Sequence, residues 1–152
     1  MLLLRHASAG APLPARMGDR ERTLDERGRD DGDRLRHTLE DYVLERVVTS
    51  PHVRCVETVR SLAVARGLAL ELRDELAPDA ARESTLALLE ELPTAALVCT
   101  HREVIERLFD GEVECEKGGA WLLDKVDGRW WPARYHPPRS SVGAGRAVTA
   151  VG

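Results

Sequence analysis

Two arginines and two histidines each follow closely on a short apolar run of the chain. They are the adjacent pair Arg5 and His6, then Arg54, and finally His101. The planar fork of an arginine matches the oxygens of a phosphate group. Neutral imidazole can attack phosphorus, and neighbouring arginines favour its neutral form by lowering its pKa. This set of residues therefore predicts a site that binds a phosphoryl group and holds a histidine able to accept it.

These side chains can meet only if the apolar runs are neighbouring strands of one sheet. Short apolar runs alternate with segments of helical periodicity, which is typical of an α/β domain with a mostly parallel sheet. In such sheets ligands bind at the carboxyl ends of the strands. Ser50 and Pro51 read as an N-cap followed by proline in the first helical position. The predicted strands are 1–4, 47–49, 69–72 and 95–100, and the predicted helices are 25–43, 51–67, 82–92 and 102–109.

The last part of the sequence predicts two antiparallel strands. Residues 119–126 and 129–135 are predicted to pair as a hairpin joined at Asp127 and Gly128, a dipeptide that favours tight hairpin turns. The predicted fold is thus a three-layer α/β domain, a mostly parallel sheet flanked by helices, ending in an antiparallel hairpin. We expect residues 1–136 to form this domain and residues 137–152, which lack periodicity, to be a disordered tail.

Three short motifs resemble the signatures of the histidine phosphatase superfamily, whose members have the phosphoglycerate-mutase-like fold. An Arg-His pair ends the first strand, a Ser-Pro-x-x-Arg motif precedes a helical threonine, and an apolar strand ends in histidine. Within the superfamily the chain resembles SixA-type phosphohistidine phosphatases and the histidine-phosphatase domain of two-domain bacterial Nudix hydrolases. The segments that carry the resemblance are Leu4–Gly10, Thr23–Gly28, Thr49–Thr58 and Val98–His101.

The resemblance implies a role for each residue of the set. His6 is the expected nucleophile, which becomes phosphorylated and is then freed by water. Arg5, Arg54 and His101 are expected to hold the phosphoryl group during catalysis. No metal and no cofactor is expected.

The resemblance also offers candidates for the general acid and for a further substrate-binding residue. Glu75 best matches the position of the family's acidic residue, with Asp74 and Asp79 as rivals. Arg102 follows His101 where the family often has a small or amide residue. Arg102 is therefore a candidate substrate-binding residue that would extend the positive site.

Three functions remain open from the sequence. The first is a phosphohydrolase that removes phosphoryl groups from phosphohistidine on proteins. The second is a phosphatase of nucleotides or polyphosphates that acts with a Nudix partner. The third is a module that recognises phosphate without catalysis, although a module of that kind would be expected to have lost His6 or Arg54.

The charge and the apolar runs of the chain restrict the classes of partner that it is expected to bind. The chain has 152 residues, 22 basic against 26 acidic side chains and a net charge of −4, which disfavours sequence-independent nucleic-acid binding. No apolar run reaches the length of a membrane span. We therefore expect a cytoplasmic monomer that acts on a phosphorylated protein or small molecule, without nucleic-acid or membrane partners.

Overall fold

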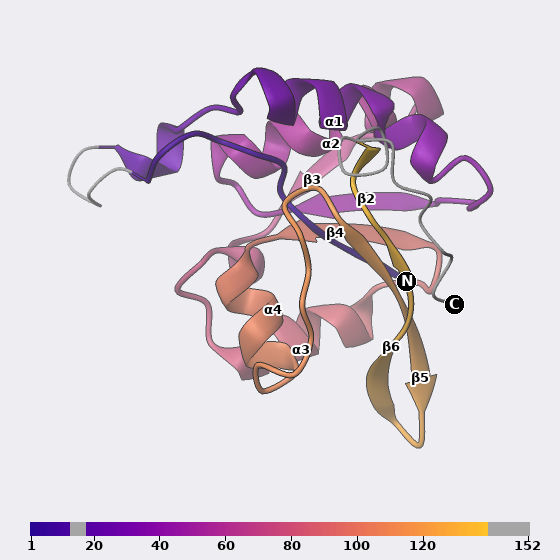
Figure 1. Ribbon diagram of the computed structural model, residues 1–152. Coiled ribbons are helices and arrows are strands. Elements are labelled where there is room, and N and C mark those ends of the chain that lie inside the picture. Colours follow the sequence, from indigo (N-terminus) through magenta and orange to yellow (C-terminus); the bar gives the residue numbers. More distant parts are fainter. Residues whose placement is uncertain (13–17, 140–152) are drawn as a thin grey trace.

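Six strands form one sheet in the order β3-β2-β4-β1-β5-β6 (Figure 1). The computed structural model describes residues 1–12 and 18–139, so the predicted disorder of the tail falls almost wholly outside the described residues. The strands are β1 Leu2–Arg5, β2 Arg46–Thr49, β3 Leu70–Leu72, β4 Ala96–Thr100, β5 Ala120–Val126 and β6 Arg129–His136.

The sheet is parallel in its first four strands and antiparallel in the last two. β1 pairs in parallel with β4 and antiparallel with β5, and β2 lies between β3 and β4. β5 and β6 form the predicted hairpin, whose two turn residues Asp127 and Gly128 have φ of 50° and 76°. Positive φ at both turn positions is what a tight hairpin turn requires. The predicted mostly parallel sheet and its terminal hairpin are confirmed.

Helices cover both faces of the sheet, which makes the three layers seen in Figure 1. α1 Glu26–Thr38 and α2 Val53–Arg66 pack on one face, and α3 Arg82–Glu91 and α4 Arg102–Leu108 pack on the other. Successive side chains of a strand point to opposite faces. Leu2 and Leu4 accordingly enter the core beside α1 and α2, and Leu3 enters the core beside α3 and α4. The continuous apolar run of β1 is thus explained by burial on both faces.

Two predicted helix boundaries are wrong. α2 begins at Val53 with His52 in the N-cap position, and Ser50 and Pro51 form the turn before it. The Oγ of Ser50 accepts from the backbone N–H of His52 at 3.3 Å, before the helix begins, and lies 2.8 Å from Nε2 of His101. α1 ends at Thr38 and not at Val43, whose side chain is 80% exposed.

Within residues 1–12 and 18–139, the short 3-10 helices η2 Asp19–Glu21 and η3 Asp74–Leu76 connect the larger elements. Among the helices of the described segments, none has the length and apolarity needed to cross a bilayer.

Candidate active site

The site forms where β1, β4 and β2 end side by side. The backbone N–H of His6 donates to Thr100 at 3.0 Å, and that of Ser50 donates to Cys99 at 3.0 Å, which extends the pairing one residue beyond the strands. His6 and His101 therefore emerge next to each other, with ring centroids 5.3 Å apart. The predicted convergence at the carboxyl edge of the sheet is confirmed for these two residues.

One ring nitrogen of His6, Nε2, carries no proton and faces Arg54. Nδ1 of the same ring lies 2.8 Å from the carbonyl oxygen of Ala7, so a neutral ring carries its proton there and leaves a lone pair on Nε2. Nε of Arg54 donates to that Nε2 at 3.4 Å. Burial lowers the pKa of His6 to about 4, with Arg54 and Arg5 acting in the same direction. The ring is thus neutral at physiological pH, as a nucleophile at phosphorus must be.

His101 is fully buried beneath the site. Its Nε2 lies 2.8 Å from Oγ of Ser50, and its Nδ1 lies 3.4 Å from Nη2 of Arg54. Since a guanidinium can only donate, Nδ1 is an acceptor and the ring proton lies on Nε2, toward Ser50. Burial, followed by the nearby His6 and Arg54, lowers the pKa of His101 to about 2.

Arg54 lies in the first turn of α2 and joins the two histidines. Its side chain is only 4% exposed, so the guanidinium is fixed by its surroundings. Thr58, one turn further along α2, donates to the carbonyl of Arg54 at 2.6 Å and accepts from the backbone N–H of Ala7 at 3.0 Å. The two hydrogen bonds of Thr58 thus link the start of α2 to the loop that carries His6. The threonine of the sequence motif thus has a positioning role in the fold.

Arg5 points to the opposite side of β1, toward α4. Its Nη1 donates to the carbonyl of Cys115 at 2.9 Å, and its buried Nε has no hydrogen-bond partner among the described residues. Together with Arg102 it lines a cavity of about 410 Å³. The Arg102 side chain is 60% exposed, and its Nε lies 3.6 Å from Glu106. Burial lowers the pKa of His6 and the charge of Arg5 adds to this effect, while the guanidinium of Arg5 is directed into the cavity that it shares with Arg102.

Glu75 is turned to another partner. Both of its carboxylate oxygens accept from the guanidinium of Arg73, and this contact lowers the pKa of Glu75. Within residues 1–12 and 18–139, no hydrogen bond or ion pair joins Glu75 to His6, Arg54 or His101. In this arrangement Glu75 is charged at neutral pH and has no proton to donate.

Three residues of the site were not predicted from the sequence. Asp19 accepts from Arg54 and from Arg22, and Arg22 also donates to the carbonyls of residues 9 and 10. The ring of His52, the N-cap residue of α2, packs edge-on against that of His101, with ring centroids 4.9 Å apart. Asp19 and Arg22 lie in or beside a Gly- and Pro-rich loop without periodicity, so no pattern placed them near the histidines.

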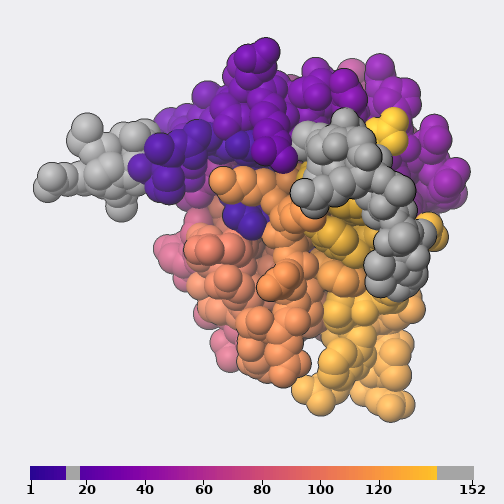
Figure 2. Space-filling view, in the orientation of Figure 1, coloured from indigo at the N-terminus to yellow at the C-terminus, as the bar shows by residue number. Residues whose placement is uncertain are grey.

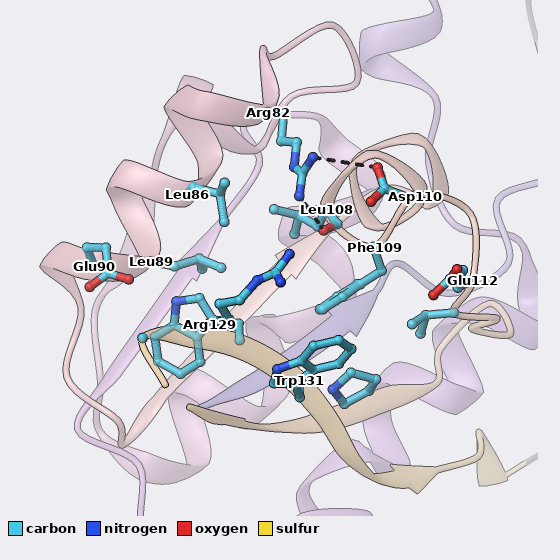
Figure 3. A pocket seen from close by; sticks show the side chains of 14 residues that line it. Arg82, Leu86, Leu89, Glu90, Leu108, Phe109, Asp110, Glu112, Arg129 and Trp131 are labelled. Carbon is cyan, nitrogen blue, oxygen red and sulfur yellow. Dashed lines mark hydrogen bonds and ion pairs between the residues drawn. The ribbon is translucent and has the colours of Figure 1, made fainter. Parts of the chain in front are cut away.

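A separate apolar pocket of about 390 Å³ lies away from the histidines. Leu86 and Leu89 of α3, Phe109 beyond the end of α4, and Trp131 of the hairpin line it, with Arg82 held to Asp110 at its edge (Figure 3). α4 begins next to His101 and ends at this pocket, so the two places lie at opposite ends of the helix. In the space-filling view the yellow hairpin stands apart from the orange segment near its tip (Figure 2). Trp130 and Trp131 of the hairpin border this pocket.

Comparison with known proteins gives one family and several similar folds. The family model described as histidine phosphatase superfamily (branch 1) matches residues 1–135. An 8-oxo-(d)GTP phosphatase of Mycolicibacterium smegmatis is 29% identical over 155 residues, which is 91% of this chain and 48% of that protein. The chain thus spans about half the length of this curated relative.

Solved structures support the fold. The protein histidine phosphatase SixA in complex with tungstate has a TM-score of 0.72 at 21% identity, covering 93% of this chain and 99% of SixA. A mycobacterial glucosyl-3-phosphoglycerate phosphatase in complex with VO3 has a TM-score of 0.71 at 13% identity, covering 90% and 98%. The phosphoglycerate-mutase-like fold expected from the sequence is confirmed.

Proposed function

The chain belongs to the histidine phosphatase superfamily (branch 1), a family of phosphatases, and we propose that it removes phosphoryl groups through a phosphohistidine formed on His6. The observation that carries the proposal is the unprotonated Nε2 of His6, which lies 3.4 Å from Nε of Arg54. The His6 ring is buried, and its pKa is lowered to about 4. A neutral nucleophile beside a guanidinium suits attack on an anionic phosphoryl group.

The reaction has two steps. In the first, the lone pair of His6 Nε2 forms a bond to phosphorus, and the bond from phosphorus to the leaving group breaks with its electron pair. In the second, water attacks the same phosphorus, the N–P bond breaks, and Nε2 recovers its lone pair as inorganic phosphate leaves. Arg54 and Arg5 offset the charge that gathers on the phosphoryl oxygens. A bound dianion would also raise the pKa of His101, so that its Nδ1 could donate to one of them.

Phosphohistidine on a protein is the substrate class that we favour. Glu75, the expected general acid, is charged and bound by Arg73. An imidazole leaving group needs less help from a positioned acid than an alkoxide does.

A nucleotide or polyphosphate substrate is the second candidate. It is favoured by the similarity to the 8-oxo-(d)GTP phosphatase, of which this chain spans about half. In that case a Nudix protein would be the expected partner. Phosphate recognition without catalysis is the third candidate, and it predicts phosphate binding with no turnover of any phosphorylated compound.

The test is capture of the phosphoenzyme. Brief incubation with 32P-labelled phosphohistidine protein, quenched without acid, should label the wild-type chain with an acid-labile, alkali-stable bond. His6→Ala should abolish the label, whereas His37→Ala, on the exposed face of α1, should keep it. An alkali-labile adduct, or label that persists in His6→Ala, would refute the assignment of His6.

A further inference from the structure

Asp19 holds the face of Arg54 that a phosphate would use. Nη1 of Arg54 donates to the backbone carbonyl of Asp19 at 3.0 Å, and Nη2 lies 3.4 Å from the Asp19 carboxylate. A guanidinium grips phosphate in a bidentate manner through paired N–H groups such as these. The third nitrogen of Arg54, Nε, is directed at His6. Asp19 thus engages both terminal nitrogens, Nη1 through its backbone carbonyl and Nη2 through its carboxylate, and Nη2 also lies 3.4 Å from Nδ1 of His101.

The Asp19 carboxylate is itself fixed. Its second oxygen accepts from Nε of Arg22 at 3.1 Å, and Arg22 is anchored in turn to the carbonyls of Ala9 and Gly10. The Asp19 carboxylate thus forms ion pairs with two guanidinium groups, those of Arg22 and Arg54. The Asp19 side chain is 25% exposed, in contrast to 4% for Arg54, so solvent and ligands can reach it. An anion of this chain therefore occupies the mouth of the proposed phosphoryl site.

We propose that Asp19 is an internal anion that competes with the phosphoryl group for Arg54, and that it weakens the binding of free phosphate and of small phosphate compounds. The proposal rests on the function above only in placing the phosphoryl group at Arg54. The Asp19 carboxylate neutralises a nearly buried guanidinium, and a dianion must displace this carboxylate to bind Nη2 of Arg54, because Nη1 is held by the backbone carbonyl of Asp19 and not by its side chain. Substrates with further contacts to the protein can offset that cost, and free phosphate cannot.

The experiment is calorimetric titration of the full chain with inorganic phosphate. Asp19→Asn keeps the size of the side chain and removes its charge, so phosphate should bind about tenfold more tightly. Asp30→Asn is the matched control: it removes the same charge from an exposed ion pair with Arg34, and binding should not change. Unchanged or weaker binding by Asp19→Asn would overturn the proposal, since it would mean that Asp19 only orients Arg54.

A second comparison separates competition from a general effect of charge. In an Arg54→Ala background, Asp19→Asn should no longer tighten phosphate binding, because the group competed for is gone. Equal tightening in both backgrounds would overturn the proposal. If Asp19→Asn fails to fold, Asp19→Ser tests the same point with the same expected direction.

The binding measurement needs no turnover, so it is independent of the test of catalysis. A chain that binds phosphate more tightly as Asp19→Asn but forms no phosphoenzyme would refute the proposed reaction and support the role of Asp19. If the wild-type chain forms the phosphoenzyme but Asp19→Asn does not bind phosphate more tightly, the proposed reaction is supported and the role of Asp19 is refuted. Failure of both proteins to bind phosphate would overturn this role of Asp19.

Discussion

His6 and His101 are held uncharged in a buried site, and this couples stability to pH. Burial lowers their pKa values to about 4 and about 2, whereas in the unfolded chain both take up protons near pH 6.5. Between those values the unfolded state binds more protons, so the free energy of unfolding should rise with pH from about 4 to 6.5 and then level off. Each histidine adds up to about 1.4 kcal/mol per pH unit in that window.

Urea unfolding between pH 4.5 and 7.5 would test this coupling. The slope against pH should be smaller for His6→Gln than for wild type, and His37→Gln should match wild type. A wild-type slope that His6→Gln leaves intact would argue against a neutral, buried His6.

Arg54 is the residue at which the geometry of a guanidinium should matter most. A lysine supplies one point charge and cannot reach His6, His101 and a phosphoryl oxygen in the same way. We expect Arg54→Lys to lose about 10- to 1,000-fold in kcat/KM, or roughly 1.4–4 kcal/mol. Steady-state kinetics on an aryl phosphate would measure this loss, with exposed Arg34→Lys as the control. Near-normal kcat/KM for Arg54→Lys would place Arg54 outside the reacting site.

Sheet geometry allowed the sequence to place His6, Arg54 and His101 together, and their catalytic roles stay predictions. His6 and His101 directly follow strands, Arg54 lies in the first turn of the helix after β2, and the carboxyl ends of these strands meet in one parallel sheet. Asp19 could not be found in this way, because a contact made by a loop has no periodic signal. Glu75 is a different case. The position of a motif predicted Glu75 as the acid, but its carboxylate accepts from the nearby Arg73.

At the scale of elements, α1 helps to fix the loop that carries His6. A Cβ added to Gly28 would lie 1.9 Å from the carbonyl oxygen of Ser8, two residues beyond His6, whereas one added to Gly32 would meet Thr58 of α2 at 3.2 Å. The glycine at position 28 thus permits a close approach of helix and loop that any side chain would prevent.

Gly28→Ala should therefore be much more harmful than Gly32→Ala, although both gain helix propensity. For Gly28→Ala we expect a loss of about 1–3 kcal/mol in the free energy of unfolding, because backbone must shift, and reduced activity through displacement of the loop. Chemical denaturation and kinetics on both variants provide the comparison. Equal effects of the two substitutions would mean that the loop moves freely away from α1.

The elements themselves were predicted more accurately than their ends. The alternating pattern identified every strand and long helix, since each is set by burial over many residues. The start of α2 was missed because Ser50 and Pro51 have the residue types of a helix start. The Ser50 hydroxyl instead lies within hydrogen-bond distance of a buried histidine from another strand, and a local pattern cannot show such a distant partner.

At the scale of the whole molecule, the stretch between α2 and β4 contributes no segment that covers the site. Between α2 and β4 lie only β3, η3 and α3, and these complete the sheet and its second helical layer. A crevice of this kind surrounds the phosphoryl group and leaves the rest of a ligand with few contacts. It can therefore accept a phosphorylated side chain on another protein, and it should bind small phosphate esters weakly.

The nature of the leaving group should then decide the preferred substrate. An alkoxide needs a proton from a positioned acid, and Glu75, the predicted acid, is held in its charged form by Arg73. An imidazole or the phosphate tail of an anhydride leaves more readily without such help. We expect phosphohistidine or a nucleoside triphosphate to be hydrolysed faster than a sugar phosphate under one condition, and Glu75→Gln to change the faster rates by less than about threefold, or about 0.7 kcal/mol. Asp74→Gln is the control for a charge change in the same short helix. Fastest turnover of the sugar phosphate would contradict both the open site and the conclusion that Glu75 is not a positioned acid, because that substrate needs enclosure as well as a proton donor.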